Sequence, residues 1–395
     1  MTMQPRILAL FGGAVLFGQE RGNIEALRAL KEQGCEVLCL LRDDREGVLI
    51  THALHANGLS WIKVPYIEHR TPGRMWHFVF RNPVAFIRAN WRFMGVVRKF
   101  RPTHIHALNP IYVLNFLIGL VLVPVPMIYR AGDEPLVHNW VWRALWRFIA
   151  WRSTHFVANS KFVARSLCSQ GSAESSVSVI YNAPSRRGPT AGPLETWMDS
   201  GEGLLIAYVG QIAEHKGVHI LIDAFRALAA EFPEAQLTIA GRISDWSGDA
   251  WARNLRDVTN SDPFIGSRVA FVGEISNVPE LMARASVHAT PSLFEDPSPN
   301  VVMEAKQAGS PSIVFPRGGM PELIEDGVDG FVCPKPTAEA LADALRHYLA
   351  DPELARRHGA AALTSLNRLQ VNQFRVRWLE VYLNSLPPVA PSAEN

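Results

Sequence analysis

The sequence predicts an α/β protein made of two doubly wound domains, and two observations lead to this prediction. Each half of the 395-residue chain opens with a short apolar strand, a glycine-containing loop and an amphipathic helix, the start of a βαβ unit. A segment rich in Pro, Gly and Ser (residues 183–193) separates the halves, as expected of a linker. The length suits two domains of ordinary size.

The first half follows this pattern from its start. We expect a strand over 6–11, a turn at Gly12 and Gly13, a helix over 23–33 and a strand over 36–41. Ile24, Leu27 and Leu30 fall on one face of that helix, and Gly34 ends it. Because strands joined by a crossover helix lie parallel, a parallel sheet is predicted.

The second half repeats the pattern. Short apolar strands are expected over residues 204–209, 235–240, 269–272, 286–289 and 312–315. The helix after the first of them has an apolar stripe formed by Val218, Leu221, Ile222, Phe225 and Leu228. In such sheets ligands bind where the strands end, so the loops after the strands are the candidate binding segments.

These patterns give a division of the chain. We predict a first domain over 1–185, a linker over 186–203, a second domain over 204–371, a helix over 372–386 and a tail over 387–395. The late helix is expected to pack back on the first domain, and the tail to be disordered.

Composition is that of a soluble globular protein, with 48% hydrophobic and 19% charged residues. Residues 1–195 carry a net charge of +11 and residues 196–395 a net charge of −9, which suggests domains with different partners. The four cysteines form no Cys-x-x-Cys pair, and the chain opens without the long apolar run of a signal peptide. We therefore expect free thiols in the reducing cytoplasm.

One apolar segment, residues 113–129, imitates a membrane span. It contains Asn115, Pro124 and Pro126 and is shorter than the roughly 20 residues of a spanning helix. A buried helix, a Pro-containing turn and a strand over 127–130 explain it better.

The stretch from Asp296 to Glu304 is the most informative in the chain. Ser298 suits an N-cap and Pro299 the first helical position, so a helix is predicted to run to about residue 308 and to stop at Gly309. The backbone around Asn300 would then offer N–H groups to a phosphate, with one acid on each side. A capped surface helix with two solvated acids is the alternative interpretation.

Two further loops follow strands of the second domain. Residues 210–217 include Gly210, Gln211 and Lys216 and can neutralise a diphosphate, although the spacing is not that of a Walker loop. Residues 317–322 form a glycine turn before a helix. Each alone reads as an ordinary surface loop, but all three are expected to gather at one sheet edge, which favours a site.

In the first half, Gly12 and Gly13 permit close approach of the backbone to a ligand. His104 and His106 lie on a predicted strand, and we expect them on opposite faces, unable to share a metal ion. One of them suits an acid, a base or a hydrogen-bond donor. A packed or solvated histidine is the alternative.

A basic, tryptophan-rich region follows. Arg81, Arg88, Arg92 and Lys99 recur at helical spacing, with aromatic residues between them. Further tryptophans and arginines lie over 140–152, and Asp133 and Glu134 are the only acids between residues 69 and 173. Such helices favour an anionic membrane surface; nucleic acid and a core helix with a solvated basic face are the alternatives.

These motifs resemble the retaining glycosyltransferases of family 4. The family pattern of Glu, seven residues, Glu, then Ala and Gly-x-Pro reads here as Asp296, Glu304-Ala305 and Gly309-Ser-Pro311. Further matching segments are 157–160, 179–182, 209–217 and 318–327, in the family's order. The resemblance implies the GT-B fold, in which two Rossmann-like domains face each other across a cleft.

By position, the resemblance assigns catalytic roles to His106, Asp296 and Lys216. Asp296 would hold sugar hydroxyls, and Lys216 the diphosphate of the donor. The donor-binding set it implies is Gly12, Gly13, Gly210, Gln211, Lys216, Asn300, Val301, Val302 and Glu304, with Glu304 on the ribose. The family usually needs no metal for catalysis, and the sequence shows no metal cluster, so neither a metal nor another cofactor is expected.

The implied activity is transfer of a sugar from a UDP- or GDP-sugar to a saccharide or lipid-linked acceptor, with retention. We expect this in the synthesis of cell envelope, exopolysaccharide or glycolipid at the cytoplasmic face of the membrane, without nucleic acid as a partner. Two departures from the pattern are Asp296, which is one methylene shorter than Glu, and Gln211, where Arg is common. A GT-B nucleotide-sugar 2-epimerase and a catalytically degenerate GT-B binding module remain as alternatives.

Overall fold

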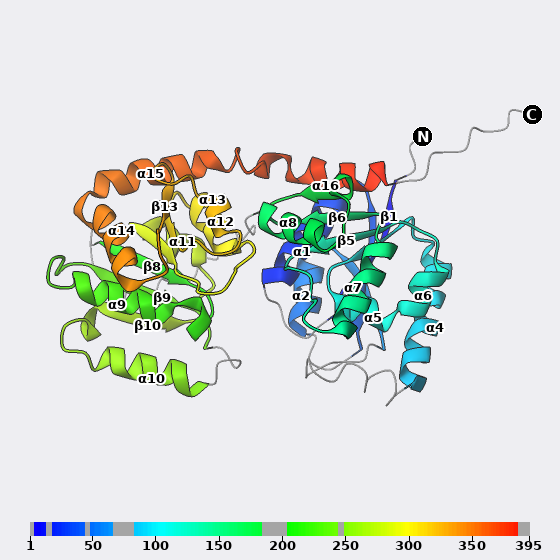
Figure 1. Ribbon diagram of the computed structural model, residues 1–395, viewed down its shortest axis with the longest axis horizontal. Coiled ribbons are helices and arrows are strands. Elements are labelled where there is room, and N and C mark those ends of the chain that lie inside the picture. The colour runs from blue at the N-terminus through cyan, green and yellow to red at the C-terminus, as the bar shows by residue number, and fades with distance from the viewer. Residues whose placement is uncertain are drawn as a thin grey trace, which may run out of the picture. The chain divides into compact units, whose positions relative to one another are not determined.

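The structure is a computed structural model that describes residues 4–12, 18–43, 48–65, 83–183, 204–243 and 249–385. It divides into two compact units: unit 1 comprises Met1–Tyr181 with Gln373–Asn395, and unit 2 comprises Asn182–Asn372. Each unit is a parallel sheet with helices (Figure 1). The predicted linker over 186–203 and the tail over 387–395 lie outside the described residues.

Unit 1 has a seven-stranded sheet in the order β3-β2-β1-β4-β5-β6-β7. Its strands are β1 (Arg6–Leu10), β2 (Glu36–Arg42), β3 (Ser60–Val64), β4 (His104–Ala107), β5 (Met127–Ala131), β6 (His155–Ala158) and β7 (Val177–Val179). Every residue of β4 and β5 is buried, as expected of central strands covered on both faces.

The helices of unit 1 lie between these strands. They are α1 (Gly18–Glu32), α2 (Val48–Ala56), α4 (Pro83–Phe100), α5 (Pro110–Asn115), α6 (Leu117–Leu122), α7 (Trp140–Arg152) and α8 (Lys161–Ser169). Helix α1 is followed by Gly34, whose φ of +89° lies in the left-handed region that favours glycine.

Unit 2 has a six-stranded sheet in the order β10-β9-β8-β11-β12-β13. The strands are β8 (Leu205–Val209), β9 (Gln236–Ala240), β10 (Val269–Gly273), β11 (Val287–Thr290), β12 (Ser312–Val314) and β13 (Gly330–Val332). The helices are α9 (Val218–Leu228), α10 (Asp249–Asn260), α11 (Val278–Arg284), α12 (Asn300–Gln307), α13 (Met320–Leu323), α14 (Ala338–Ala350) and α15 (Pro352–Ser365).

Both sheets reverse their strand order once, which is the arrangement of Rossmann-like domains. In unit 1 the reversal lies between β1 and β4, and in unit 2 between β8 and β11. The loops at the carboxyl ends of these strands are the places where ligands bind in open α/β sheets. The predicted doubly wound fold is therefore confirmed.

The apolar segment 113–129 folds as predicted into helix, turn and strand, but the expectation of a buried helix was wrong for α6, where Ile118, Val121 and Leu122 are exposed. Helix α5 ends at Asn115, α6 covers Leu117–Leu122, and Pro124 and Pro126 precede β5. No helix in the described part of the chain is both long and apolar enough to cross a membrane. Cys35, Cys39 and Cys333 are buried free thiols, and Cys168 is a half-buried one.

The last helix, α16 (Phe374–Asn384), packs against α1 of unit 1, although it follows unit 2 in the sequence (Figure 1). Arg375 of α16 pairs with Glu32 of α1 at 2.9 Å. Trp378 and Tyr382 are almost completely buried. Unit 1 is thus completed by residues distant in sequence.

Candidate functional site

Three loops meet at the carboxyl edge of unit 2. They follow the adjacent strands β8, β11 and β12. The backbone N–H of Leu293 donates to the carbonyl of His215 at 2.9 Å, and that of Gly319 donates to the carbonyl of Asp296 at 2.9 Å. The loop after β11 is therefore bonded to both of its neighbours, as the sequence predicted.

Two glycines permit this close approach. Gly217 has a φ of +71°, and a Cβ there would lie 1.9 Å from the carbonyl oxygen of Pro291. Gly318 has a φ of +58°, and its Cβ would lie 2.3 Å from the carbonyl oxygen of Asp296. Both positions require glycine because any side chain would collide with backbone that is itself fixed.

Lys216 and Asp296 form the central contact of the three loops. The ammonium Nζ of Lys216 lies 2.9 Å from Oδ2 of Asp296, and the side chains are 22% and 9% exposed. The same Nζ lies 4.3 Å from the centre of the Phe294 ring, in cation–π geometry. The lysine is therefore held in place by two neighbours while part of it remains accessible to solvent.

A second ion pair lies beside the first. Nη1 of Arg317 lies 3.1 Å from Oε1 of Glu295, and the other oxygen of Glu295 accepts the backbone N–H of Gly318 at 2.5 Å. Both side chains are more than a third exposed, so this pair contributes little stability and is easily exchanged for another partner. Two consecutive acids thus each hold one cation of the site.

Helix α12 begins at Asn300, and its N-cap is Pro299 without a side-chain cap. The expectation that Ser298 caps this helix was wrong. Ser298 is instead buried, and its hydroxyl has no hydrogen-bond partner among the described residues. The predicted stop is confirmed, because Ala308 is the C-cap and Gly309 has a φ of +72°.

Asn300, Val301 and Val302, the residues predicted to bind phosphate, differ in which of their polar groups are already bonded within the fold. The N–H of Val302 already donates to the carbonyl of Pro299 at 3.2 Å. The side-chain amide of Asn182 donates to Oδ1 of Asn300 at 2.8 Å, which fixes the start of the helix to the first residues of unit 2. Val301 is half-buried and precedes the first intrahelical bond.

Glu304 lies half-buried on α12, about one turn after Asn300. The end of this helix is anchored by Lys306, whose Nζ lies 2.7 Å from Oδ2 of Asp329 and 3.0 Å from Oγ of Ser365. Burial lowers the pKa of Lys306, and the hydrogen bond to Asp329 opposes that shift. The anchor gives the helix that carries Glu304 a fixed position within unit 2.

In the loop after β8, some backbone groups form hydrogen bonds within unit 2. The N–H of Gly210 donates to the carbonyl of Ala240 at 3.0 Å. The hydroxyl of Tyr208 donates to the carbonyl of Gln211 at 2.7 Å. Gly210 and Gln211 therefore shape the loop, and Lys216 is the side chain that it presents.

In unit 1, His106 is completely buried and both of its ring nitrogens are bonded. Nδ1 lies 2.5 Å from the hydroxyl of Tyr382, and Nε2 lies 2.7 Å from Oδ1 of Asn23. Burial, together with the nearby positive charge of Arg130, lowers its pKa to about 3. His106 is thus a neutral imidazole at physiological pH.

The expectation that His104 and His106 lie on opposite faces was wrong. Residues two apart in a strand share a face. Both rings accordingly lie against Tyr382, with centroids 5.0 Å and 6.3 Å away. Burial lowers the pKa of His104 to about 4.

A small pocket of about 180 Å³ opens within unit 1 beside the ends of β4 and β5. Asp133 and Glu134, the isolated acids of the basic region, lie at its lining with Trp142 and Trp146. Nearby Arg130 is buried, and burial lowers its pKa to about 10, with the charges of Asp133 and Glu20 opposing. It remains cationic at neutral pH.

The glycine pair after β1 is described only in part. The carbonyl of Gly12 accepts a hydrogen bond from the hydroxyl of Tyr112 at 2.6 Å. Gly13 lies outside the described residues. Within the described ranges, no three His, Cys, Asp or Glu side chains are grouped in a way that holds a metal ion.

Comparisons with known proteins cover both units. The profile described as "Glycosyltransferase Family 4" matches residues 18–183, and "Glycosyl transferases group 1" matches residues 199–364. The glycogen synthase of Mycobacterium tuberculosis is 30% identical over 302 residues, which are 70% of this chain and 68% of that protein. The chain belongs to glycosyltransferase family 4. The resemblance drawn from the motifs is confirmed.

One further relative and one solved structure extend this picture of the glycosyltransferase. The alpha-D-kanosaminyltransferase of Streptomyces kanamyceticus is 32% identical over 158 residues, 39% of this chain and 38% of that enzyme. Anabaena HepE, solved in complex with UDP-glucose, is similar in structure with a TM-score of 0.78 at 20% identity, covering 97% of this chain and 100% of that chain. This similarity confirms the GT-B type of fold with two Rossmann-like domains.

The structure thus brings together the predicted residues of unit 2: Lys216, Asp296, Asn300 and the helix of Glu304. Sequence reasoning missed Glu295 as the partner of Arg317, and Tyr382 as the partner of His106. Glu295 could have been noticed in the sequence as an acid directly beside Asp296. Tyr382 had no local signal, because 276 residues separate it from His106.

Proposed function

We propose that this glycosyltransferase moves a sugar from a UDP- or GDP-sugar to a saccharide or lipid-linked acceptor, with retention of the anomeric configuration. The observation that carries the proposal is the contact of three loops at the strand-order reversal of unit 2. There Lys216, the start of α12 and Glu304 lie on one edge of the sheet. HepE, solved with UDP-glucose, has the same fold and supports a nucleotide-sugar as donor.

In the proposed reaction the bond between the anomeric carbon and the diphosphate oxygen breaks, and a bond to an acceptor hydroxyl oxygen forms. The electron pair goes to the departing diphosphate, and the acceptor proton leaves with it or passes to solvent. Lys216 and the N–H groups at the start of α12 stabilise the charge that develops on the diphosphate. The hydroxyl of Ser298 is a further donor beside this helix start.

The acids have separate roles in the proposal. Glu304 accepts hydrogen bonds from the ribose hydroxyls of the nucleotide, since it lies about one turn beyond the phosphate end of α12. Asp296 accepts bonds from hydroxyls of the transferred sugar once Lys216 turns to the diphosphate. Binding of the donor therefore exchanges the ion pair seen here for two contacts to the ligand.

His106 has a reduced role in this proposal. Both of its ring nitrogens are bonded inside unit 1, to groups of α1 and α16. We therefore assign it to positioning: it holds these helices against the carboxyl end of β4. No metal or other cofactor enters the proposed reaction.

A donor screen tests the proposal. Purified protein is incubated with UDP- and GDP-sugars at millimolar concentrations, and thermal protection and nucleotide release are measured together. We expect one nucleotide class to raise the midpoint of thermal unfolding and to be released when an acceptor is added. Absence of protection by every donor would contradict the proposal.

The same screen separates the alternatives. Protection without release in the presence of acceptors indicates the degenerate binding module. An epimerised sugar formed without acceptor indicates the epimerase, which membership in family 4 does not favour. For retention, NMR of the product must show the same anomeric configuration as the donor.

We also propose that the acceptor is met at the cytoplasmic face of a membrane, in cell-envelope, exopolysaccharide or glycolipid synthesis. The excess of basic residues in unit 1 supports this placement. Membrane fractionation of cells tests it, and recovery of all protein in the high-speed supernatant at low salt would contradict it.

A further inference from the structure

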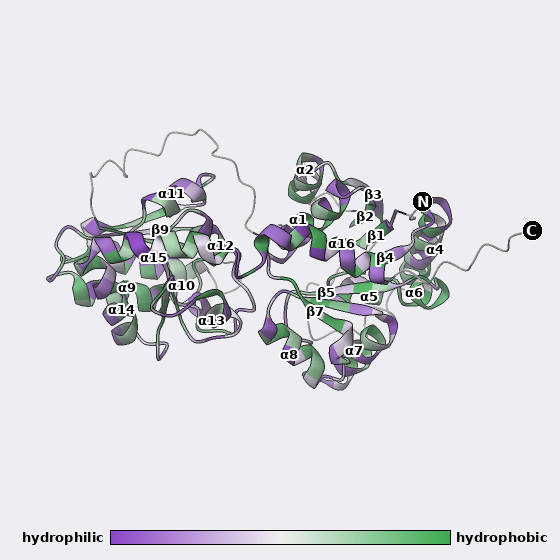
Figure 2. Ribbon diagram, turned by 90° about the horizontal axis from the view of Figure 1, so that it is seen from above, coloured by the Kyte–Doolittle hydropathy of each residue, from purple (hydrophilic) through white to green (hydrophobic). Residues whose placement is uncertain are grey.

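Helices α4 and α6 of unit 1 expose six large apolar side chains. On α4, Val84, Ile87 and Trp91 are 73%, 61% and 68% exposed. On α6, Ile118, Val121 and Leu122 are 47%, 55% and 61% exposed. The two helices lie side by side in both views (Figures 1 and 2), and we call these six residues the α4–α6 face.

The exposed residues of α4 form a stripe that is separate from its core contacts. Val84, Ile87 and Trp91 follow one another at helical spacing of three and four residues. Phe86 and Phe93 belong to the aromatic residues that lie between the basic ones of this region in the sequence, but they point into the core. The packing of α4 against the core therefore does not use the residues of this stripe.

Tight packing fixes α4 and α6 relative to each other. The side chain of Asn90 on α4 donates to the carbonyl of Asn115 at 3.1 Å and accepts from the N–H of Gly119 at 2.9 Å. A Cβ on Gly119 would lie 2.4 Å from the ring of Phe93. The two apolar rows therefore form one surface of fixed shape.

The far end of α6 is held as well. The guanidinium of Arg152 donates to the carbonyls of Leu120, Val123 and Val125, at 2.7 Å in each case. These bonds pair the carbonyl groups at the end of α6 and fix the helix in the orientation in which Ile118, Val121 and Leu122 are exposed. Their exposure is therefore a stable property of the surface.

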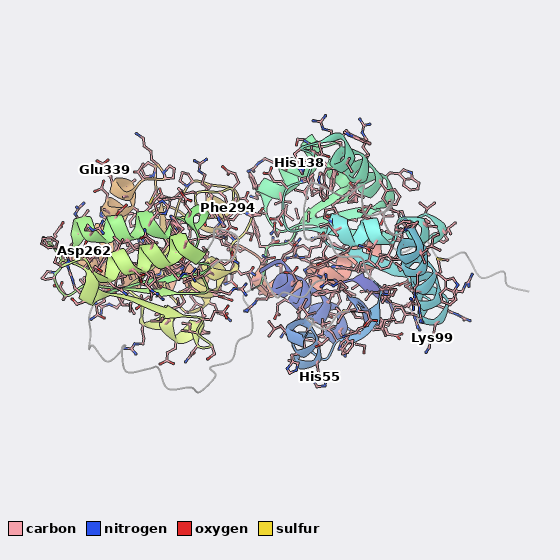
Figure 3. All side chains as sticks on the ribbon, turned by 90° about the horizontal axis from the view of Figure 1, so that it is seen from below. His55, Lys99, His138, Asp262, Phe294 and Glu339 are labelled. Atoms are coloured by element: carbon pink, nitrogen blue, oxygen red, sulfur yellow. The ribbon has the colours of Figure 1, made fainter. Side chains whose placement is uncertain are left out.

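A basic row borders this face. Arg88, Arg92 and Lys99 are exposed on α4 at spacings of four and seven residues, beside the apolar stripe, and Lys99 is labelled in Figure 3. The sequence from 83 to 122, which contains α4, α5 and α6, has five Arg or Lys and no Asp or Glu. The partner of this face must therefore be anionic as well as apolar.

We propose that the α4–α6 face docks on an anionic lipid bilayer, with its apolar side chains among the acyl chains and its basic row at the headgroups. Aliphatic residues and a tryptophan beside a row of cations match the two layers of a bilayer surface. A second copy of the chain fits less well, since a symmetric contact would bring two basic rows together. Nucleic acid would supply negative charge for the basic row, but no apolar surface for the exposed apolar side chains.

The docking surface deepens the proposed function, because it gives the enzyme access to an acceptor held in a membrane. Its test needs neither donor nor turnover. Vesicle binding and donor binding are read separately, so failure of one does not imply failure of the other.

Co-sedimentation with phosphatidylcholine vesicles, with and without phosphatidylglycerol, tests the surface. The wild type is expected to bind the anionic vesicles, and added salt is expected to weaken this binding. The variant Ile87→Ser/Trp91→Ser/Leu122→Ser is expected to bind at least about tenfold more weakly, because the apolar anchor is removed. Arg88→Gln/Arg92→Gln/Lys99→Gln is expected to lose the preference for phosphatidylglycerol.

The matched control is Val258→Ser/Phe264→Ser in unit 2, where the two side chains are 54% and 74% exposed. This control is expected to bind vesicles like the wild type. Equal losses in control and test variants, or no binding by the wild type, would overturn the proposal. So would sedimentation velocity that shows a dimer dispersed by the α4–α6 substitutions, because the face would then be an interface between copies.

Discussion

The carboxyl edges of the two sheets have the same strand-order reversal but carry polar groups of opposite kinds. At the edge of unit 2, Lys216 and Asp296 lie on loops and form an ion pair, in which the lysine is partly accessible to solvent. At the edge of unit 1, His106 is neutral, buried and bonded to the surrounding fold. This comparison is consistent with the proposal that unit 2 exchanges partners with a charged ligand, while the strand residues of unit 1 hold a framework.

The largest effect is expected from removing the cation of unit 2. Lys216→Met should lower kcat about 10²- to 10³-fold, since the charge on the departing diphosphate loses its main side-chain partner. Nucleotide release measures this effect. Lys335→Met, at an exposed lysine of the same unit, is the control and should keep wild-type turnover.

Gly318 tests the backbone contact that places Asp296. Gly318→Ala should lower the free energy of unfolding by about 3 kcal/mol, because left-handed strain adds to a collision with backbone. Gly273→Ala has similar strain at a φ of +69° but open space around its Cβ, and should cost only about 1–2 kcal/mol. Urea denaturation compares the two, and equal losses would show that the contact does not matter.

A substitution of Asp296 tests whether Lys216 exchanges this carboxylate for the diphosphate of a ligand. Asp296→Asn should bind UDP or GDP several-fold more tightly, because Lys216 no longer has a competing acid. Turnover should nevertheless fall, because the sugar loses a partner. Calorimetric titration measures the affinity, and weaker binding of the free nucleotide would contradict the exchange.

The buried histidines predict a pH effect on stability. Burial lowers the pKa of His106 and His288 to about 3 and that of His104 to about 4, so the folded state excludes protons that the unfolded chain binds below about pH 6.5. As the pH falls from 6 to 4, each of these histidines should therefore lower the free energy of unfolding by up to about 1.4 kcal/mol per pH unit.

Urea denaturation at pH 7 and pH 5 measures this slope. The variant His288→Gln should show a shallower dependence on pH, because one of the three excluded protons is gone. An unchanged slope would mean that this histidine is protonated in the folded state.

The smallest effect is expected from loosening the framework of unit 1. Tyr382→Phe removes the partner of Nδ1 of His106 and should cost about 1–2 kcal/mol of stability. The KM for the donor should stay unchanged, because the contact lies within unit 1. A large rise in that KM would show that His106 acts on the donor and not through the fold.

The contrast between the edges also explains how much the sequence could predict. Lys216, Asp296 and Glu304 could be placed at this edge because loops after strands and a helix start leave local signals in sequence. Ser298 was misplaced because Pro299 took the N-cap position, a shift of one residue that such signals do not resolve. The three-loop contact followed from topology alone, since carboxyl ends of neighbouring parallel strands meet at one edge.

Other features lay beyond sequence reasoning. The bond from Tyr382 to His106 depends on a helix that follows unit 2 and packs on unit 1. The α4–α6 face required knowing which side of α4 the core uses, and the aromatics Phe86 and Phe93 were buried by packing that no local pattern specifies. Long-range contacts and the choice of buried face are fixed only by the assembled fold.

The central claim, that the carboxyl edge of unit 2 binds the nucleotide diphosphate, is tested most directly by hydrogen–deuterium exchange with UDP or GDP. Protection should appear in residues 210–217, 293–302 and 317–319, and should be reduced in Lys216→Met. Binding of either nucleotide without protection in these three loops would contradict the account.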